Sequence, residues 1–202
     1  MKKFITLALA LCMALSASVC ASAAEISSDG GSGSTPVYLS STDDGTMEGE
    51  PSATAMSVTV PTALPMAMSQ TGDVTTADNC QIINHSYGAV RVKSVTISAE
   101  NGWRLTAFGD KSTLASEKVD SNQLGFALCI GDGEWAVTDS SDESTQALIS
   151  APIAGCYMSG AGNAANNTVS VDYRAIVTPL STPVTNANIA NVVFVIEWDT
   201  AA

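Results

Sequence analysis

Short runs of alternating apolar and polar residues, separated by glycine, asparagine and proline, make up most of this chain. The clearest run covers residues 89–98, where Val90, Val92, Val95 and Ile97 are spaced to face a common core. Their spacing changes phase between Val92 and Val95, which predicts a β-bulge at that point. Because a period of two residues is typical of strands with one buried face, we expect an all-β protein.

The spacing of these runs predicts a single β-sandwich. Two long strands are expected at 168–177 and 189–198, and the second is apolar enough to lie in the middle of a sheet. The sequence Gly-Asp-Gly-Glu at 131–134 predicts a tight hairpin turn. In all, roughly eight to ten short strands separated by turns indicate an immunoglobulin-like β-sandwich over residues 56–202. The other strands are expected at 57–60, 64–68, 74–76, 81–84, 103–106, 124–130, 135–137 and 147–153.

The first 24 residues have the features of a secretory signal peptide. Lys2 and Lys3 precede an apolar run over residues 4–19, and small residues follow at Ala21-Ser22-Ala23. Cleavage is expected after Ala23 or Ala24, which leaves a secreted chain. We expect no membrane span after cleavage, because no second run of apolar residues approaches the length of a spanning helix. No LPxTG-type sorting motif is present, so the mature protein is expected to be released or held by non-covalent contacts.

Residues 25–55 are expected to be a flexible, acidic linker rich in glycine and serine. Apolar residues are too few in this segment to offset the entropy that ordering would cost. The exception is the short apolar patch Pro36-Val37-Tyr38-Leu39. Two interpretations of this patch stay open: a chance cluster, or a strand donated to the sheet edge of a neighbouring molecule.

The mature chain is expected to be strongly acidic. The whole chain has 8 Lys and Arg against 20 Asp and Glu, and removal of Lys2 and Lys3 changes the net charge from −12 to 6 − 20 = −14. A field of this sign repels phosphate groups, so nucleic acid is not expected as a partner.

Residue types that carry catalysis are sparse. His85 is the only histidine, and it lies in an expected turn. The carboxylates at 132–143 lack the spacing of a calcium-binding loop, so we interpret them as part of an exposed acidic loop. We therefore expect no catalytic residue, no metal site and no cofactor, and predict that the protein is not an enzyme.

Three cysteines remain in the mature chain, and their state is open. An exported protein can form disulfides, and Cys129 with Cys156 is the pairing we favour, which leaves Cys80 free. In the alternative, all three are reduced and act as small buried residues.

The three tryptophans also have two interpretations. Trp103, Trp135 and Trp198 offer flat surfaces on which a carbohydrate can stack, but each lies in a strand-like stretch, which favours packing in the core.

A family resemblance rests on four short stretches. Trp103-Arg104-Leu105 is a W-x-L sequence that follows an expected strand and an Asn-Gly turn. Together with the stretches at 57–61, 173–177 and 195–198, it resembles the WxL-type surface proteins of Gram-positive bacteria over residues 56–199. More loosely, a signal peptide followed by a small β-sandwich is similar to secreted matrix and filament proteins of the TasA and camelysin kind.

The resemblance implies a secreted, non-catalytic surface protein that binds cell-wall peptidoglycan non-covalently. It assigns Trp103, Leu105 and Trp198 as wall-binding residues. The alternative is a structural subunit of an extracellular filament or biofilm matrix, assembled by strand donation between copies or with other surface proteins.

Overall fold

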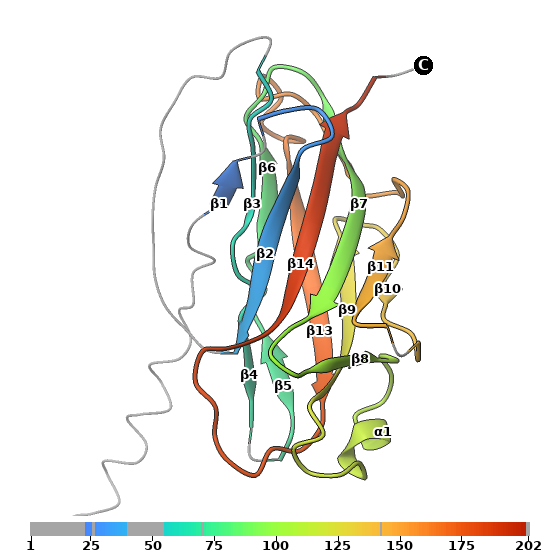
Figure 1. Cartoon of the computed structure of the whole chain (residues 1–202). Helices are drawn as coiled ribbons and strands as arrows, with labels where there is room; N and C mark the ends of the chain where they lie inside the picture. The colour runs from blue at the N-terminus through green and yellow to red at the C-terminus, as the bar shows by residue number, and fades with distance from the viewer. Residues whose placement is uncertain (1–22, 26, 40–54, 70, 142, 201–202) are drawn as a thin grey trace, which may run out of the picture.

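Two β-sheets pack face to face in the computed structural model, which describes residues 23–25, 27–39, 55–69, 71–141 and 143–200 (Figure 1). The fold is therefore an all-β sandwich, as the alternating pattern predicts. The larger sheet has the order β1 (Ala23–Glu25), β3 (Val58–Pro61), β6 (Gln81–Asn84), β13 (Thr168–Val177), β9 (Gln123–Ile130) and β10 (Ala136–Val137), with β8 (Arg104–Thr106) also beside β9.

The second sheet has five strands, and two smaller elements complete the fold. A hairpin of β4 (Met66–Met68) and β5 (Val74–Thr76) lies at one end of the sandwich, together with the one-turn helix α1 (Ser112–Ala115) (Figure 1). The order of the second sheet is β11 (Thr145–Ile149), β7 (Val90–Ala99), β14 (Ala187–Trp198) and β2 (Ser32–Leu39), with β12 (Tyr157–Met158) also beside β7.

The predicted bulge in β7 is confirmed. Four residues of β7 are fully buried: Val90, Val92, Val95 and Ile97. Val92 and Val95 are three residues apart, whereas a regular strand would place buried residues two apart. The register between β7 and β14 shifts at the same place, so that Lys93 is the extra residue on β7. The bulge therefore keeps both halves of the strand facing the core.

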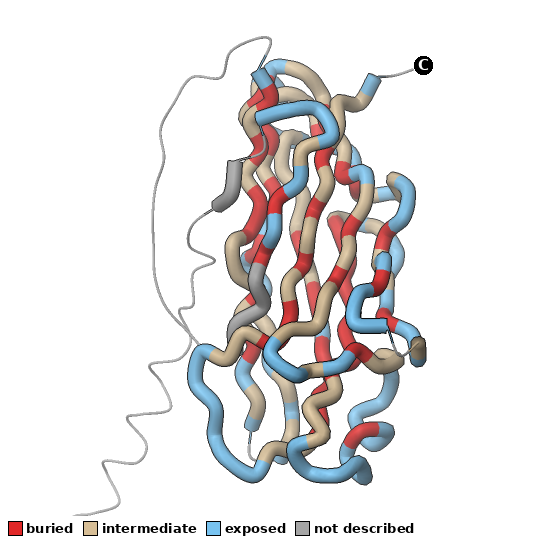
Figure 2. Tube along the Cα trace, in the orientation of Figure 1, coloured by how far each residue is buried: buried red, intermediate tan, exposed pale blue. Residues whose placement is uncertain are grey.

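The core lies between the two sheets, where the buried residues of each face meet (Figure 2). Phe126 on β9 and Phe194 on β14 are its largest fully buried side chains. The strand β14, predicted to be central, lies between β7 and β2.

The prediction of a flexible linker over residues 25–55 is wrong for residues 32–39. This segment forms β2, which pairs antiparallel with β14 from Ser32 opposite Val195 to Leu39 opposite Ala187. Strand pairing uses backbone groups, so the serine- and glycine-rich residues 32–35 can extend the same strand as the apolar patch at 36–39. Residues 40–54 of the predicted linker lie outside the described residues.

The predicted signal peptide is described only at its end. Residues 1–22 lie outside the described residues, and the expected cleavage site after Ala23 or Ala24 falls within β1, which pairs with β3.

The buried hydroxyl of Tyr173 connects the β4–β5 hairpin to the larger sheet. It donates a hydrogen bond to the carbonyl oxygen of Pro65 at 2.6 Å and accepts one from the amide of Ala77 at 3.1 Å. Burial raises the pKa of this hydroxyl above its ordinary value of 10.0, against the opposing effect of the Ala77 amide. The neutral hydroxyl is therefore part of the folded structure.

We predict that Tyr173→Phe lowers the free energy of unfolding by about 1–2 kcal/mol at neutral pH, since two partly buried backbone groups lose their partner. Because the unfolded chain ionises first, the wild type should lose stability as the pH rises above the ordinary tyrosine pKa. The Phe variant lacks this loss, so the gap between the two proteins should narrow. Urea unfolding across this pH range measures the gap, and a gap that stays constant contradicts the assignment.

Three glycines allow the turn after β9 to pack directly against the chain before β12. A Cβ on Gly155, which has φ +88°, would lie 2.1 Å from the carbonyl oxygen of Ile130. A Cβ on Gly133 would lie 2.4 Å from the carbonyl oxygen of Ala154, and one on Gly131 would lie 3.1 Å from that of Gly155. This close backbone contact joins the two sheets, because β9 and β12 belong to different sheets.

We expect Gly155→Ala to lower the free energy of unfolding by at least about 2 kcal/mol, from both the clash and the left-handed backbone. Gly162→Ala is the matched control, because no atom lies within 4 Å of its added Cβ. Chemical denaturation of both variants checks this, and equal stabilities would contradict the close packing.

Candidate functional site

The W-x-L residues follow a turn and lead into β8, where they pack against the core. Asn101 and Gly102 adopt positive φ values of 50° and 82°, and the amide of Trp103 donates to the carbonyl oxygen of Glu100 at 2.9 Å. Trp103 is half-buried against the core, while Leu105 on β8 is only 4% exposed. The motif therefore fixes the start of β8 against the sandwich.

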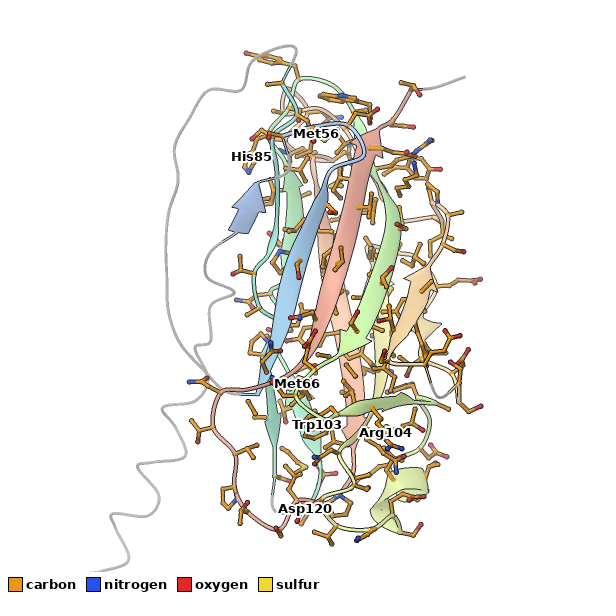
Figure 3. All side chains as sticks on the ribbon, viewed as in Figure 1. Met56, Met66, His85, Trp103, Arg104 and Asp120 are labelled. Atoms are coloured by element: carbon orange, nitrogen blue, oxygen red, sulfur yellow. The ribbon has the colours of Figure 1, made fainter. Side chains whose placement is uncertain are left out.

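Trp198 ends β14 and is half-buried as well. Its indole ring covers Gly88, where a Cβ would lie 2.8 Å from the ring. Its partner on β7 is Val90, at the start of that strand, whereas Trp103 follows the end of β7. The two tryptophans assigned by the resemblance are thus at opposite ends of the sandwich, and Figure 3 places Trp103 away from the end that carries His85.

The contacts that hold β2 define the strongest candidate site, which we call the β2 edge: β2 with the turn at 28–31 before it, paired on β14. Successive residues of this strand alternate between buried and exposed positions: Gly33 and Thr35 are buried, and Ser32 and Ser34 are exposed. The Thr35 hydroxyl donates to the carbonyl oxygen of Pro61 on β3, in the opposite sheet.

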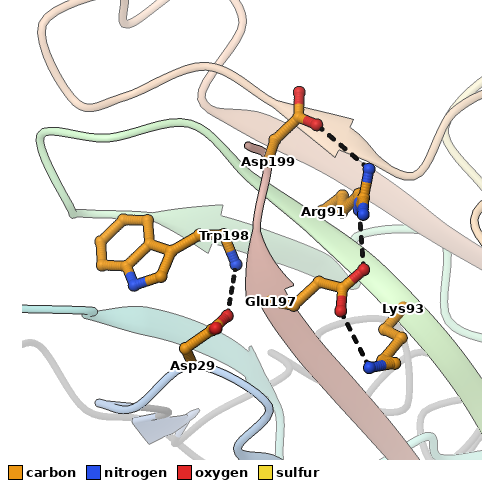
Figure 4. A network of polar contacts seen from close by, with 6 residues as sticks. All are labelled: Asp29, Arg91, Lys93, Glu197, Trp198 and Asp199. Atoms are coloured by element: carbon orange, nitrogen blue, oxygen red, sulfur yellow. Dashed lines mark hydrogen bonds and ion pairs between the residues drawn. The ribbon is translucent and has the colours of Figure 1, made fainter. Parts of the chain in front are cut away.

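Two further hydrogen bonds fix the start of β2. The amide of Trp198 donates to a carboxylate oxygen of Asp29 at 2.8 Å (Figure 4). The amide of Ile196 donates to the carbonyl oxygen of Gly31 at 3.0 Å. These contacts set the register of β2, because a shift of one residue would break both.

Charged residues surround the end of β14 near this edge (Figure 4). Glu197 accepts hydrogen bonds from Arg91 at 2.8 Å and from Lys93 at 3.0 Å, and Asp199 is 3.4 Å from Arg91. Hydrogen bonds from Lys93 and then Arg91 lower the pKa of the Glu197 carboxyl. These pairs are partly exposed, so they orient side chains more than they stabilise the fold.

His85 takes part in one side-chain contact that the sequence did not suggest. Its Nε2 is 2.6 Å from the hydroxyl of Thr59 on β3, and its amide donates to the carbonyl oxygen of Ser57 at 2.8 Å. The ring thereby joins the turn after β6 to β3. Among the described residues, no group of three or more His, Cys, Asp and Glu is placed to hold a metal ion.

The cysteines differ from the pairing favoured by the sequence. Cys129 and Cys156 are both free and buried, whereas Cys80, which the favoured pairing left free, is disulfide-bonded. Burial raises the pKa of both free thiols. The Cys129 thiol donates to the carbonyl oxygen of Gly133 at 3.1 Å, within the glycine contact.

No family model matches this chain, and neither the curated proteins nor the solved structures contain a match. The resemblance to WxL-type proteins therefore stays a prediction. In the described ranges, no helix has the length and apolar character needed to cross a membrane.

The burial of the W-x-L residues predicts that they stabilise the fold, and a variant can distinguish this role from wall binding. We predict that Trp103→Ala lowers the free energy of unfolding by about 2–4 kcal/mol, since it removes a large side chain from the edge of the core. Arg104→Ala, at the exposed position between the two motif residues, is the control and should change stability by less than about 0.5 kcal/mol.

Denaturation and co-sedimentation with isolated cell walls measure both effects. A Trp103→Ala protein with wild-type stability that no longer pellets with walls would overturn the structural role.

Proposed function

We propose that this protein is an exported, non-catalytic subunit of an extracellular assembly, in which neighbouring copies exchange strand β2. The observation that carries the proposal is the pairing of the N-terminal segment 32–39 with β14 at the edge of the five-stranded sheet. A strand at an edge can leave and be replaced without any other strand of that sheet moving.

The composition of β2 suits exchange. Its described buried positions are the small residues Gly33 and Thr35, so its removal uncovers little apolar side-chain surface there. The backbone of β14, with Ile196 and Phe194 packed in the core behind it, would then present a row of unpaired groups. Such an edge is a template for the same segment from a second copy.

Association with the cell wall is the second candidate. It would use other side chains than the resemblance assigns, because Leu105 is buried and Trp103 and Trp198 are half-buried at opposite ends. Trp135 favours this candidate, since it is 40% exposed.

Cross-linking between two differently tagged copies tests strand exchange. One copy of the mature chain carries Ser34→Cys and the other carries Val193→Cys, two positions that are directly opposite across β2 and β14. Oxidation of the mixture should give a disulfide-linked species that contains both tags. The natural cysteines of the mature chain, Cys80, Cys129 and Cys156, are all buried and should not compete.

The matched control replaces Ser34→Cys with Ser181→Cys, an exposed position outside β2. A mixture that stays uncross-linked, while a protein with both Ser34→Cys and Val193→Cys closes an intramolecular disulfide, would mean that β2 stays with its own chain. That result would contradict the proposal.

A further inference from the structure

A second surface lies on the other sheet, on the outer face of β9, β10 and β13. Phe126 and Leu128 of β9 point into the core, so Ala127 and Cys129 point outward. In the register of the sheet, Ala127 is opposite Arg174 on one side and opposite Val137 on the other, and Cys129 is opposite Asp172. We define the Trp135 surface as Trp135, Val137, Asp172 and Arg174.

Trp135 is held in a fixed position on this surface. The guanidinium carbon of Arg174 is 4.4 Å from the centre of the Trp135 ring, a cation–π contact that crosses over β9. The small residues beneath are covered, since Ala127 is fully buried and Cys129 is 6% exposed. The indole, which directly precedes β10, is therefore anchored by a residue of β13.

The apolar part of the surface is nonetheless open to solvent. Trp135 is 40% exposed and Val137 is 49% exposed. The other two tryptophans, Trp103 and Trp198, pack against the core instead. An exposed indole beside an exposed valine, on a rigid sheet and tied by an arginine, is typical of a binding surface rather than of a packing residue.

The polar groups around the indole decide which ligand fits. Arg174 offers donors and Asp172 offers acceptors, and the hydroxyl of Ser170 is 3.1 Å from the Asp172 carboxylate. The opposite charges of Arg174 and Asp172 offset each other, and the exposed Asp132 and Glu134 near Trp135 disfavour an anion.

We propose that the Trp135 surface binds an uncharged saccharide chain. A pyranose ring has a flat face of C–H groups that stacks on an indole, and a rim of hydroxyls that pair with donors and acceptors such as Arg174 and Asp172. A protein partner fits less well, because a stable protein interface buries about 800 Å² on each side and needs a larger apolar centre than two side chains. The inference is independent of strand exchange, since it uses the other sheet.

Two neutral oligosaccharides serve as probes of the mature protein: the β-1,4-linked tetramer of N-acetylglucosamine and the β-1,4-linked tetramer of glucose. Calorimetric titration should give saturable binding of at least one of them. Binding of only the first points to an amino-sugar polymer such as a wall glycan, and binding of the second points to a neutral glucan. Either result supports the saccharide chemistry.

The variants decide whether Trp135 carries the binding. Trp135→Ala should weaken it at least tenfold and Arg174→Gln severalfold, while Tyr87→Ala, which removes another exposed aromatic, should leave it unchanged. Thermal unfolding should show that Trp135→Ala remains folded, because its side chain is outside the core. Absence of saturable binding to both probes, or equal binding by Trp135→Ala, overturns the proposal. A Trp135→Ala protein that binds both probes as the wild type does but has lost self-association would also overturn the proposal, because the surface would then contact protein.

Discussion

The unpaired N–H and C=O groups along the sheet edges are the constraint on which this structure depends. Every edge that a sandwich leaves open is a site for pairing with another chain. In this chain β2 covers the β14 edge of the five-stranded sheet, whereas β1, which pairs with β3 in the larger sheet, contains the expected cleavage site. Because the pairing of β2 with β14 is made by the backbone, a strand whose first half is only serine, glycine and threonine can still form it. The composition of this stretch does not specify its register, and the hydrogen bonds of Asp29 and Thr35 do so.

The sequence predicts those elements whose side chains alternate between core and solvent. The bulge in β7 could be predicted because each buried valine marks the phase of its half of the strand. The same reasoning fails for the first half of β2, where the buried positions 33 and 35 are glycine and threonine and show no apolar alternation. What places β2 is a long-range backbone ladder, and a single sequence holds no direct signal of such a partner.

The tryptophans illustrate the same limit for the candidate sites. All three lie in strand-like stretches, so spacing alone cannot separate them. The structure places Trp103 and Trp198 against the core and leaves Trp135 exposed under the guanidinium of Arg174. That contact joins residues far apart in the chain, which pair only through the register of β9, β10 and β13. The β2 edge and the Trp135 surface belong to different sheets, so a copy engaged through one would keep the other accessible.

Hydrogen exchange on β14 tests the central claim most directly, namely that β2 is a replaceable strand. Mature protein that lacks residues 27–39 is compared with and without a synthetic peptide of that segment. The account predicts rapid exchange at the β14 amides that face β2, among them Ile196 and Trp198, and restored protection when the peptide is added. The β14 amides that face β7 should stay protected throughout and serve as the internal reference. Protection that does not return with the peptide would contradict the account, because β2 could then pair with β14 only within its own chain.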